Sequence, residues 1–194
     1  MAITTELIKE LRDKTGVSIM QCKKALEESG GDIEKAIIAL QKQSKAIASK
    51  KGGRTLAAGV VASYLHAGGN VGTLVELSCE TDFVSKNEEF KKLAHDIAMH
   101  VAASNPQFLK RGDVSEEAEK KAREVFAKEI EGKPVDLQEK IIKGKLDAYF
   151  DEKTLMRQAF IKDPDKKISD LVESAIQKFG ERIEVSRFVR FAVE

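Results

Sequence analysis

The spacing of apolar residues changes from a helical pattern to a strand pattern across the pair Gly52-Gly53. Before this pair, apolar residues recur every three to four positions, as in an α-helix that packs on one face. After it, residues 60–66 and 72–79 are rich in β-branched residues, and residues 67–70 between them are typical of a turn, so they predict a β-hairpin. Helices, hairpin, helices and a last strand, in that order, predict the α+β class.

Three short helices are expected in the first 45 residues. Thr5 can cap the first, and Gly16 can end it in the left-handed conformation. Ser18 and Gln21 form a capping-box pair at the start of the second, and Asp32 can cap the third. We expect a three-helix module that, with a basic linker, occupies residues 1–54.

The linker assignment depends on charge. Five basic residues occur with no acid among them: Lys42, Lys45, Lys50, Lys51 and Arg54. With Gly52-Gly53 inside it, this segment resembles a frayed helix end and a linker. The whole chain carries 33 basic and 32 acidic residues, a net charge of +1, which argues against general attraction to nucleic acid or anionic membranes. No apolar run approaches the roughly 20 residues that span a bilayer, so we expect a cytoplasmic protein that does not enter membranes.

The core is expected over residues 55–194. Asn87 can cap a helix that runs to about residue 103, and residues 168–179 and 182–193 predict a helix and a final strand. Two helices, 115–131 and 135–151, are expected to form a hairpin at about 113–152, separated by Gly132-Lys133-Pro134. Their narrow apolar stripes are predicted to be Ala118, Ala122, Val125, Phe126 and Ile130 on one helix and Ile142, Leu146 and Tyr149 on the other.

The sequence contains none of the motifs that mark covalent or nucleotide chemistry. There is no Gly-x-x-x-x-Gly-Lys-Ser/Thr loop and no His-Glu-x-x-His. His95 and His100 are separated by about 500° of helical rotation, so they point to different faces and do not share a metal. Cys79 is interpreted as a small hydrophobic residue at a strand end, because no basic group is placed to activate its thiol. We expect no catalytic residue, metal or cofactor, and therefore no enzyme.

Four features have both a structural and a functional interpretation. Phe83 in Thr81-Asp82-Phe83-Val84 could pack into the core, or it could be an exposed aromatic residue that inserts into a partner. Met20 and Lys23 could pack and be solvated, or they could contact a partner. His66 at the hairpin tip could be structural or functional, and the helical hairpin could be a solvated arm or a contact arm.

Four segments of this chain resemble the bacterial elongation factor Ts family. They are residues 11–36, with Leu11-Arg12-Asp13-Lys14-Thr15-Gly16 and Cys22-Lys23-Lys24-Ala25-Leu26; 75–84, ending in Thr81-Asp82-Phe83-Val84; 97–106; and 160–191, with Phe160-Ile161-Lys162-Asp163-Pro164 and Arg187-Phe188-Val189-Arg190-Phe191. They occur in the family's order over nearly the whole chain. The resemblance implies an amino-terminal module similar to ubiquitin-associated domains and a core with a small antiparallel sheet, flanking helices and a helical hairpin.

The resemblance also implies a function. Members of the family bind elongation factor Tu with GDP and promote GDP release by displacing Mg²⁺. The residues that match the displacing motif are Thr81, Asp82, Phe83 and Val84, and those that match partner-binding positions are Arg12, Met20, Lys23 and His66. Longer members have two related core subdomains, whereas this chain has one, and the short form is implied to pair as a homodimer through the core.

Two other hypotheses remain at the sequence level. A module similar to ubiquitin-associated domains could belong to an adaptor protein, although that role would not use Thr81–Val84. A nucleic-acid binder could use the segment from Lys42 to Arg54, but this segment has no interleaved aromatic residues for base stacking. We therefore expect no direct binding of nucleic acid.

Overall fold

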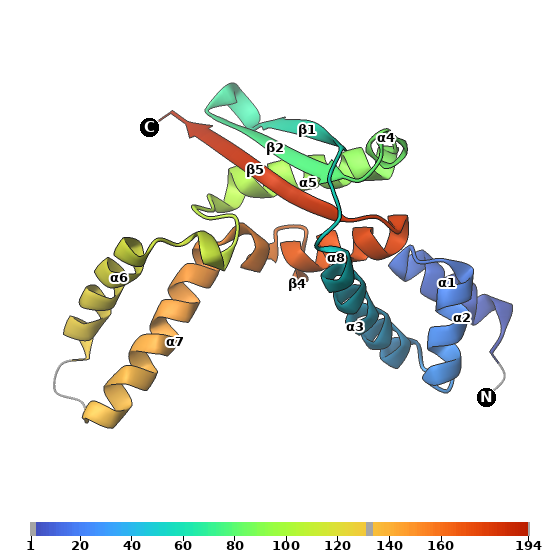
Figure 1. Ribbon diagram of the computed structural model, residues 1–194, viewed down its shortest axis with the longest axis horizontal. Helices are drawn as coiled ribbons and strands as arrows, with labels where there is room; N and C mark the ends of the chain where they lie inside the picture. Colours follow the sequence, from blue (N-terminus) through green and yellow to red (C-terminus); the bar gives the residue numbers. More distant parts are fainter. Residues whose placement is uncertain (1–2, 131–133, 194) are drawn as a thin grey trace. The chain divides into compact units, whose positions relative to one another are not determined.

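A computed structural model of the chain describes residues 3–130 and 134–193 and has the α+β architecture expected from the sequence (Figure 1). The helices are α1 (Thr5–Thr15), α2 (Ile19–Glu28), α3 (Ile33–Lys51), α4 (Asp82–Ser85), α5 (Glu88–Ser104), α6 (Glu116–Glu129), α7 (Val135–Lys153) and α8 (Ile168–Phe179). The strands are β1 (Ala58–Leu65), β2 (Val71–Cys79), β3 (Ala159–Phe160), β4 (Asp163–Lys167) and β5 (Ile183–Ala192).

The described residues form two compact units. The first contains the residues up to Ala62 together with Glu76–His95 and Asp170–Ser186, and the second contains Ser63–Val75, Asp96–Ser169 and the residues from Arg187 onward. The boundary that we predict at residues 54/55 follows the change of apolar period, and it stays a prediction.

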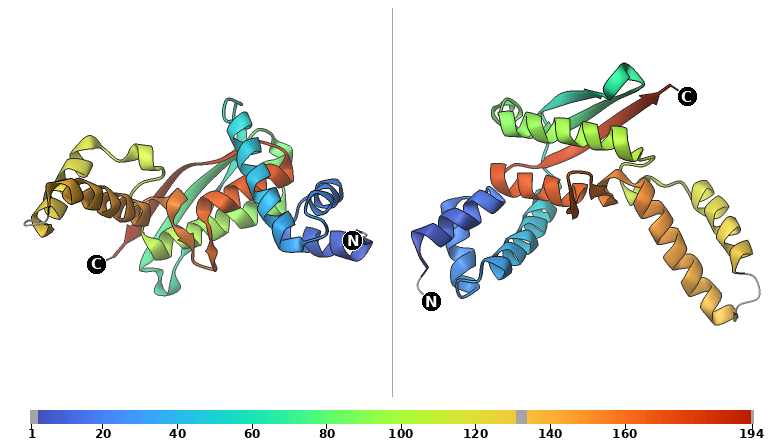
Figure 2. Two further views of the ribbon diagram at one scale, coloured as in Figure 1. Left: turned by 90° about the horizontal axis from the view of Figure 1, so that it is seen from below. Right: turned by 180° about the vertical axis from the view of Figure 1, so that it is seen from behind.

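The core contains a three-stranded sheet with the order β1-β2-β5. The hairpin predicted from residues 60–79 is confirmed, because the His66 N–H donates to the Val71 carbonyl at 2.9 Å across the turn. The final strand runs antiparallel to β2, as the 2.9 Å bond from Val193 N–H to the Asn70 carbonyl shows. Helix α5 runs along one face of the sheet (Figure 2), and the Thr73 hydroxyl donates to the Ala98 carbonyl at 2.8 Å.

The first three helices have their own apolar core within the first unit. Its buried members are Leu11, Val17, Cys22, Ala25, Leu26, Ala36 and Leu40. The caps predicted at Ser18 and Asp32 are confirmed, since each side chain accepts a backbone N–H of its helix. The cap predicted at Thr5 is wrong: Thr5 is already helical, and the Thr4 hydroxyl accepts the Leu7 N–H at 3.3 Å.

Helix α3 continues through the basic segment that the sequence suggested was a frayed end. It reaches Lys51 because its last turns are held against α8 within the first unit. Ser44 is buried and bonds the Leu40 carbonyl at 2.9 Å and the side chain of Gln177. Lys45 lies 3.8 Å from Asp170, so part of the positive charge is paired with α8.

Helices α6 and α7 lie side by side in the second unit and confirm the predicted hairpin (Figure 1). Two members of the predicted stripes are wrong. Val125 is 57% exposed. On α7 the buried aromatic residue is Phe150 and not Tyr149, because Ile142, Leu146 and Phe150 are spaced four residues apart and share a helix face. The resulting cluster is Ile130, Ile142, Leu146 and Phe150. Gly132 and Lys133 lie outside the described residues.

The β3–β4 hairpin was not predicted from the sequence. Ala159 pairs with Lys167 and Phe160 with Asp163 in antiparallel register. Two residues are too few to show an alternating pattern, and Pro164 argues against a strand because it has no N–H to donate.

Candidate functional site

The corner between β2 and α4 contains the segment Thr81–Val84. Strand β2 ends at Cys79, and α4 is a helix of four residues. Val84 and Ser85 are buried and fix one side of this helix, whereas Phe83 is 84% exposed. Phe83 therefore does not pack into the core, and its ring projects from a corner whose next residues are anchored.

Asp82 supplies an anion beside the exposed ring. Its carboxylate accepts a hydrogen bond from Lys86 Nζ at 2.6 Å, one helical turn later. This hydrogen bond, together with the Lys86 charge, lowers the pKa of Asp82, so the carboxylate is ionised at neutral pH. The corner thus presents an aromatic ring and an ionised oxygen acceptor on adjacent residues.

The interpretation of Cys79 as a strand-end hydrophobic residue is confirmed by its burial. Burial is the main cause that raises the pKa of this thiol, and the nearby charge of Glu181 raises it further. The Cys79 Sγ donates to the Thr81 carbonyl at 3.2 Å. The thiol is therefore protonated at neutral pH and contributes to the shape of the corner.

Glu181 is a residue of this corner that sequence reasoning missed. Its carboxylate accepts the N–H of Glu80 at 3.1 Å, the N–H of Thr81 at 3.0 Å and the hydroxyl of Thr81 at 2.6 Å. The contact joins residues about 100 positions apart, so no local pattern could have revealed it. The only signal in the sequence is an acidic residue directly after Gly180, in the turn before the last strand.

A second exposed surface lies at the start of α2. Met20, at 81%, and Lys23 are exposed there, and Arg12 is exposed on α1. Met20 and Lys23 are three residues apart on one helix, so their side chains share a face. Ile19 is 56% exposed and was missed, although its position between the Ser18 cap and Met20 could have indicated it.

His66 lies exposed in the second unit, at the β1–β2 turn. Its Nδ1 is 3.4 Å from the Tyr64 hydroxyl, and the two rings lie 6.3 Å apart between centroids. The buried histidine of the chain is His100, and His95 is exposed, which confirms that these two point to different faces of α5.

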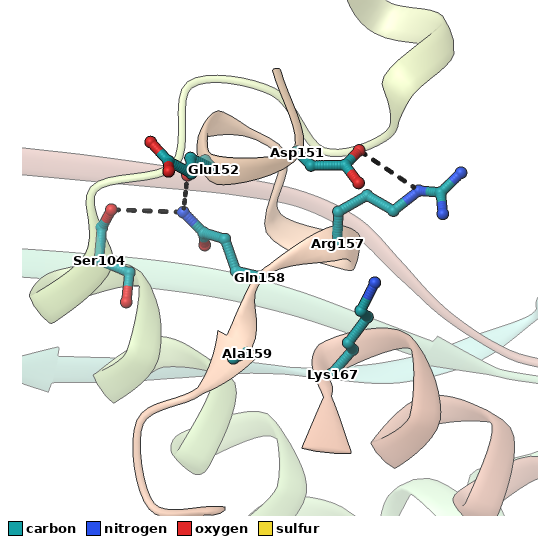
Figure 3. Close-up of a pocket in the computed structure, with 7 residues that line it drawn as sticks. All are labelled: Ser104, Asp151, Glu152, Arg157, Gln158, Ala159 and Lys167. Atoms are coloured by element: carbon teal, nitrogen blue, oxygen red, sulfur yellow. Dashed lines mark hydrogen bonds and ion pairs between the residues drawn. The ribbon is translucent and has the colours of Figure 1, made fainter. Parts of the chain in front are cut away.

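A hollow in the second unit is lined by Ser104, Asp151, Glu152, Arg157, Gln158, Ala159 and Lys167 (Figure 3). The Gln158 amide donates to the carbonyl of Glu152 at 2.7 Å and to that of Ser104 at 3.4 Å. These bonds join the ends of α5 and α7. Asp151 and Arg157 pair at 3.8 Å across the rim. We interpret the hollow as a structural joint at the base of the helical hairpin.

Over residues 3–130 and 134–193, no three His, Cys, Asp or Glu side chains come together as a metal site. In the same part of the chain, no helix has the length and apolarity needed to cross a membrane.

Comparison with known proteins gives a consistent result. The model of a family described as Elongation factor TS matches residues 2–194. The chain is 52% identical over 194 residues to Elongation factor Ts of Thermodesulfovibrio yellowstonii, covering 100% of this chain and 97% of that protein. It is 50% identical over 193 residues to Elongation factor Ts of Thermosipho melanesiensis, covering 98% of each. Because the match runs nearly from end to end at about half identity, the chain belongs to the elongation factor Ts family of translation elongation factors.

Proposed function

We propose that the chain binds elongation factor Tu with GDP in the cytoplasm and accelerates GDP release by displacing Mg²⁺ from the nucleotide site of that partner. The observation that carries the proposal is the 84% exposure of Phe83 on a short anchored helix, beside the ionised Asp82. An exposed aromatic residue on a rigid corner suits insertion between elements of a partner, because it loses little conformational freedom on binding.

The resemblance to the family implies the roles within the corner, and the exposure of Phe83 beside the buried Val84 supports them. Phe83 acts as the inserting side chain, Asp82 accepts a hydrogen bond from the partner, and Thr81 and Val84 hold the backbone on either side. Displacing the cation removes charge neutralisation from the phosphates of GDP, which weakens the hold of the partner on the nucleotide. By linkage, GDP must weaken the binding of this chain by the same factor that the chain weakens GDP binding. No covalent bond is made or broken in this proposal, so we propose an exchange factor and not an enzyme.

The first three helices supply affinity in this proposal. Met20 and Lys23, on the exposed face at the start of α2, and Arg12, on α1, contact the nucleotide-binding domain of the partner. Ile19 extends that face with further apolar area. His66, exposed on the β1–β2 turn, makes an additional contact from the core.

We also propose a homodimer formed through the sheet. Exposed apolar side chains lie on all three strands in the second unit, at Leu65, Leu74, Val189 and Phe191, and directly after the last strand, at Val193. Leu65 lies over Gly72, because a Cβ at Gly72 would come within 3.0 Å of the Leu65 Cδ2, and this places Leu65 on the same face as Leu74. Thr73, whose hydroxyl bonds α5, points to the opposite face. The face away from α5 is thus apolar and suited to pairing with a second copy.

Release of labelled GDP from elongation factor Tu tests the main proposal. The purified chain should accelerate release at substoichiometric concentration and hydrolyse no GTP when incubated alone. Release kinetics that do not change across a titration would contradict the exchange function. An adaptor or a nucleic-acid binder would give that unchanged result.

A further inference from the structure

The turn between α8 and β5 delivers an acidic side chain to the corner that carries Phe83. Gly180 follows α8 with φ of 71°, a left-handed conformation that L side chains rarely adopt, and its N–H bonds the Ile176 carbonyl at 3.0 Å. The chain therefore reverses directly after the helix, and the next residue, Glu181, reaches across to the end of β2. There it accepts the three hydrogen bonds described above from Glu80 and Thr81.

The contact is reciprocal, because the Glu80 carboxylate in turn binds the segment between α8 and β5 that contains Glu181. The Glu80 carboxylate accepts the Arg182 N–H at 2.5 Å and the Arg54 guanidinium at 3.1 Å. The Arg182 N–H is the main cause that lowers the pKa of Glu80, followed by the hydrogen bond and charge of Arg54. Each of the two turns thus caps backbone donors of the other, and neither can move without breaking bonds to the other.

We call these reciprocal hydrogen bonds of Glu80 and Glu181 the clamp. The clamp prevents the Thr81 hydroxyl from capping the start of α4. Thr81 stands at the cap position of the helix, but its hydroxyl donates to Glu181 and makes no cap bond to α4. A helix of four residues cannot maintain itself, because helix formation needs a costly nucleus. Its direction must therefore come from its two ends, which are Thr81 in the clamp and the buried pair Val84 and Ser85. Phe83 lies between these anchors and makes little contact of its own.

We propose that Glu181 is a positioning residue that fixes the start of α4 and so sets the direction in which Phe83 projects. This inference rests on the proposed function for its consequence in exchange, but it makes a physical claim that can be measured on the chain alone. A fixed ring meets the partner already ordered, whereas a loose ring must be ordered during binding, which costs affinity in the productive complex.

The substitutions Glu181→Ala and Glu181→Gln separate positioning from direct contact. Alanine removes all three bonds. Glutamine can keep them, because its oxygen can accept both N–H groups while its NH₂ donates to the Thr81 hydroxyl, which can turn and accept. We expect Glu181→Ala to lower the second-order rate constant of exchange about tenfold, equivalent to about 1.4 kcal/mol, and Glu181→Gln to stay within about threefold of the parent chain. A carboxylate that contacts a cation of the partner would instead be lost in both variants.

Two further measurements test whether the effect passes through Phe83. In the Phe83→Ala background, Glu181→Ala should cause no additional loss of exchange, because its target is already absent. On the isolated chain, which has no tryptophan, Phe83→Trp introduces a single tryptophan that can be excited selectively over the two tyrosines. The fluorescence anisotropy of this probe should decay faster when Glu181→Ala is added. Glu88→Ala is the control, since this nearby carboxylate bonds Lys91 at 2.8 Å and does not contact the corner backbone.

The outcomes are distinguishable. An anisotropy decay that does not change with Glu181→Ala would overturn the positioning role, whatever the exchange assay gives. A full additional loss in the Phe83→Ala background, or equal losses for alanine and glutamine, would also overturn it. If Phe83→Ala itself left exchange unchanged, the proposed function would fail. The anisotropy result would then still decide whether Glu181 orders the ring.

Discussion

Replacing Phe83 with alanine should slow exchange strongly and change stability little. The side chain is 84% exposed, so folding covers about one sixth of it. A phenylalanine can bury roughly 150–250 Å², so about 25–40 Å² is covered here, worth about 0.6–1 kcal/mol at about 25 cal/mol per Å². Alanine has a higher helix propensity and recovers up to about 0.5 kcal/mol of this within α4. The expected net loss of stability is therefore below about 1 kcal/mol.

Phe90 is the matched comparison within the same unit. It is fully buried, and its ring packs edge-on against Phe179 with 6.2 Å between centroids. Phe90→Ala should cost about 3–5 kcal/mol through lost burial and a cavity. Urea unfolding followed by circular dichroism gives both values, and release of labelled GDP from elongation factor Tu gives the rate for the folded fraction. Removing an aromatic side chain at an interface costs about 2 kcal/mol or more, so Phe83→Ala should reduce exchange by about 30-fold or more.

The pair of measurements can refute this reasoning in two ways. A loss of several kcal/mol of stability in Phe83→Ala would mean that the ring is packed in solution. Native-like stability together with unchanged exchange would mean that the exposed ring is not used. Phe90→Ala should show the reverse pattern, with lower stability but an exchange rate per folded molecule close to that of the parent chain.

Three further changes test other parts of the structure. Met20 is 81% exposed, so Met20→Glu should leave the midpoint of urea unfolding unchanged. The substitution should weaken the complex with elongation factor Tu by about 1–2 kcal/mol in titration calorimetry. An unchanged affinity would count against a role of the α2 face in binding. Phe191→Lys should convert the proposed dimer to a monomer in light scattering, and a parent chain that is already monomeric would refute the sheet interface. Burial lowers the pKa of His100, so the unfolded chain binds its proton first and stability should fall as pH drops below about 6.5. His100→Gln should flatten this slope, whereas replacing the exposed His95 should not.

The elements that the sequence predicts well are those whose signal is local. The caps at Ser18 and Asp32, the turn of the β1–β2 hairpin and the limits of α8 depend on residues within a few positions of one another. The extension of α3 to Lys51 could not be predicted, because it depends on contacts with α8 more than 120 positions later. Phe150 and Tyr149 are adjacent residues in a thin apolar stripe, so the pattern could not tell which of the two is buried. Packing between α6 and α7 decides it.

The same distinction applies to the candidate site. Thr81–Val84 could be found as a segment, but the periodicity alone could not tell whether Phe83 packs inward or projects. The structure separates it from Val84, which is 4% exposed although it is the next residue. Glu181 could not be identified from the sequence, because one carboxylate after a glycine is common in loops and its partners follow the end of β2, about 100 positions earlier.

The clamp at Glu181 explains how the chain can expose Phe83 at little cost in stability. An exposed ring contributes almost nothing to folding, so the folding energy of its surroundings must come from other side chains, here the buried Val84, Ser85 and Cys79. Apolar packing alone fixes one side of α4 and leaves the residues before it free to turn. Hydrogen bonds have directional geometry that apolar contacts lack, and the three bonds to Glu181 fix the other side. Stability and direction thus come from different residues, which is why a change at Glu181 should disturb exchange without removing the core that holds the corner in place.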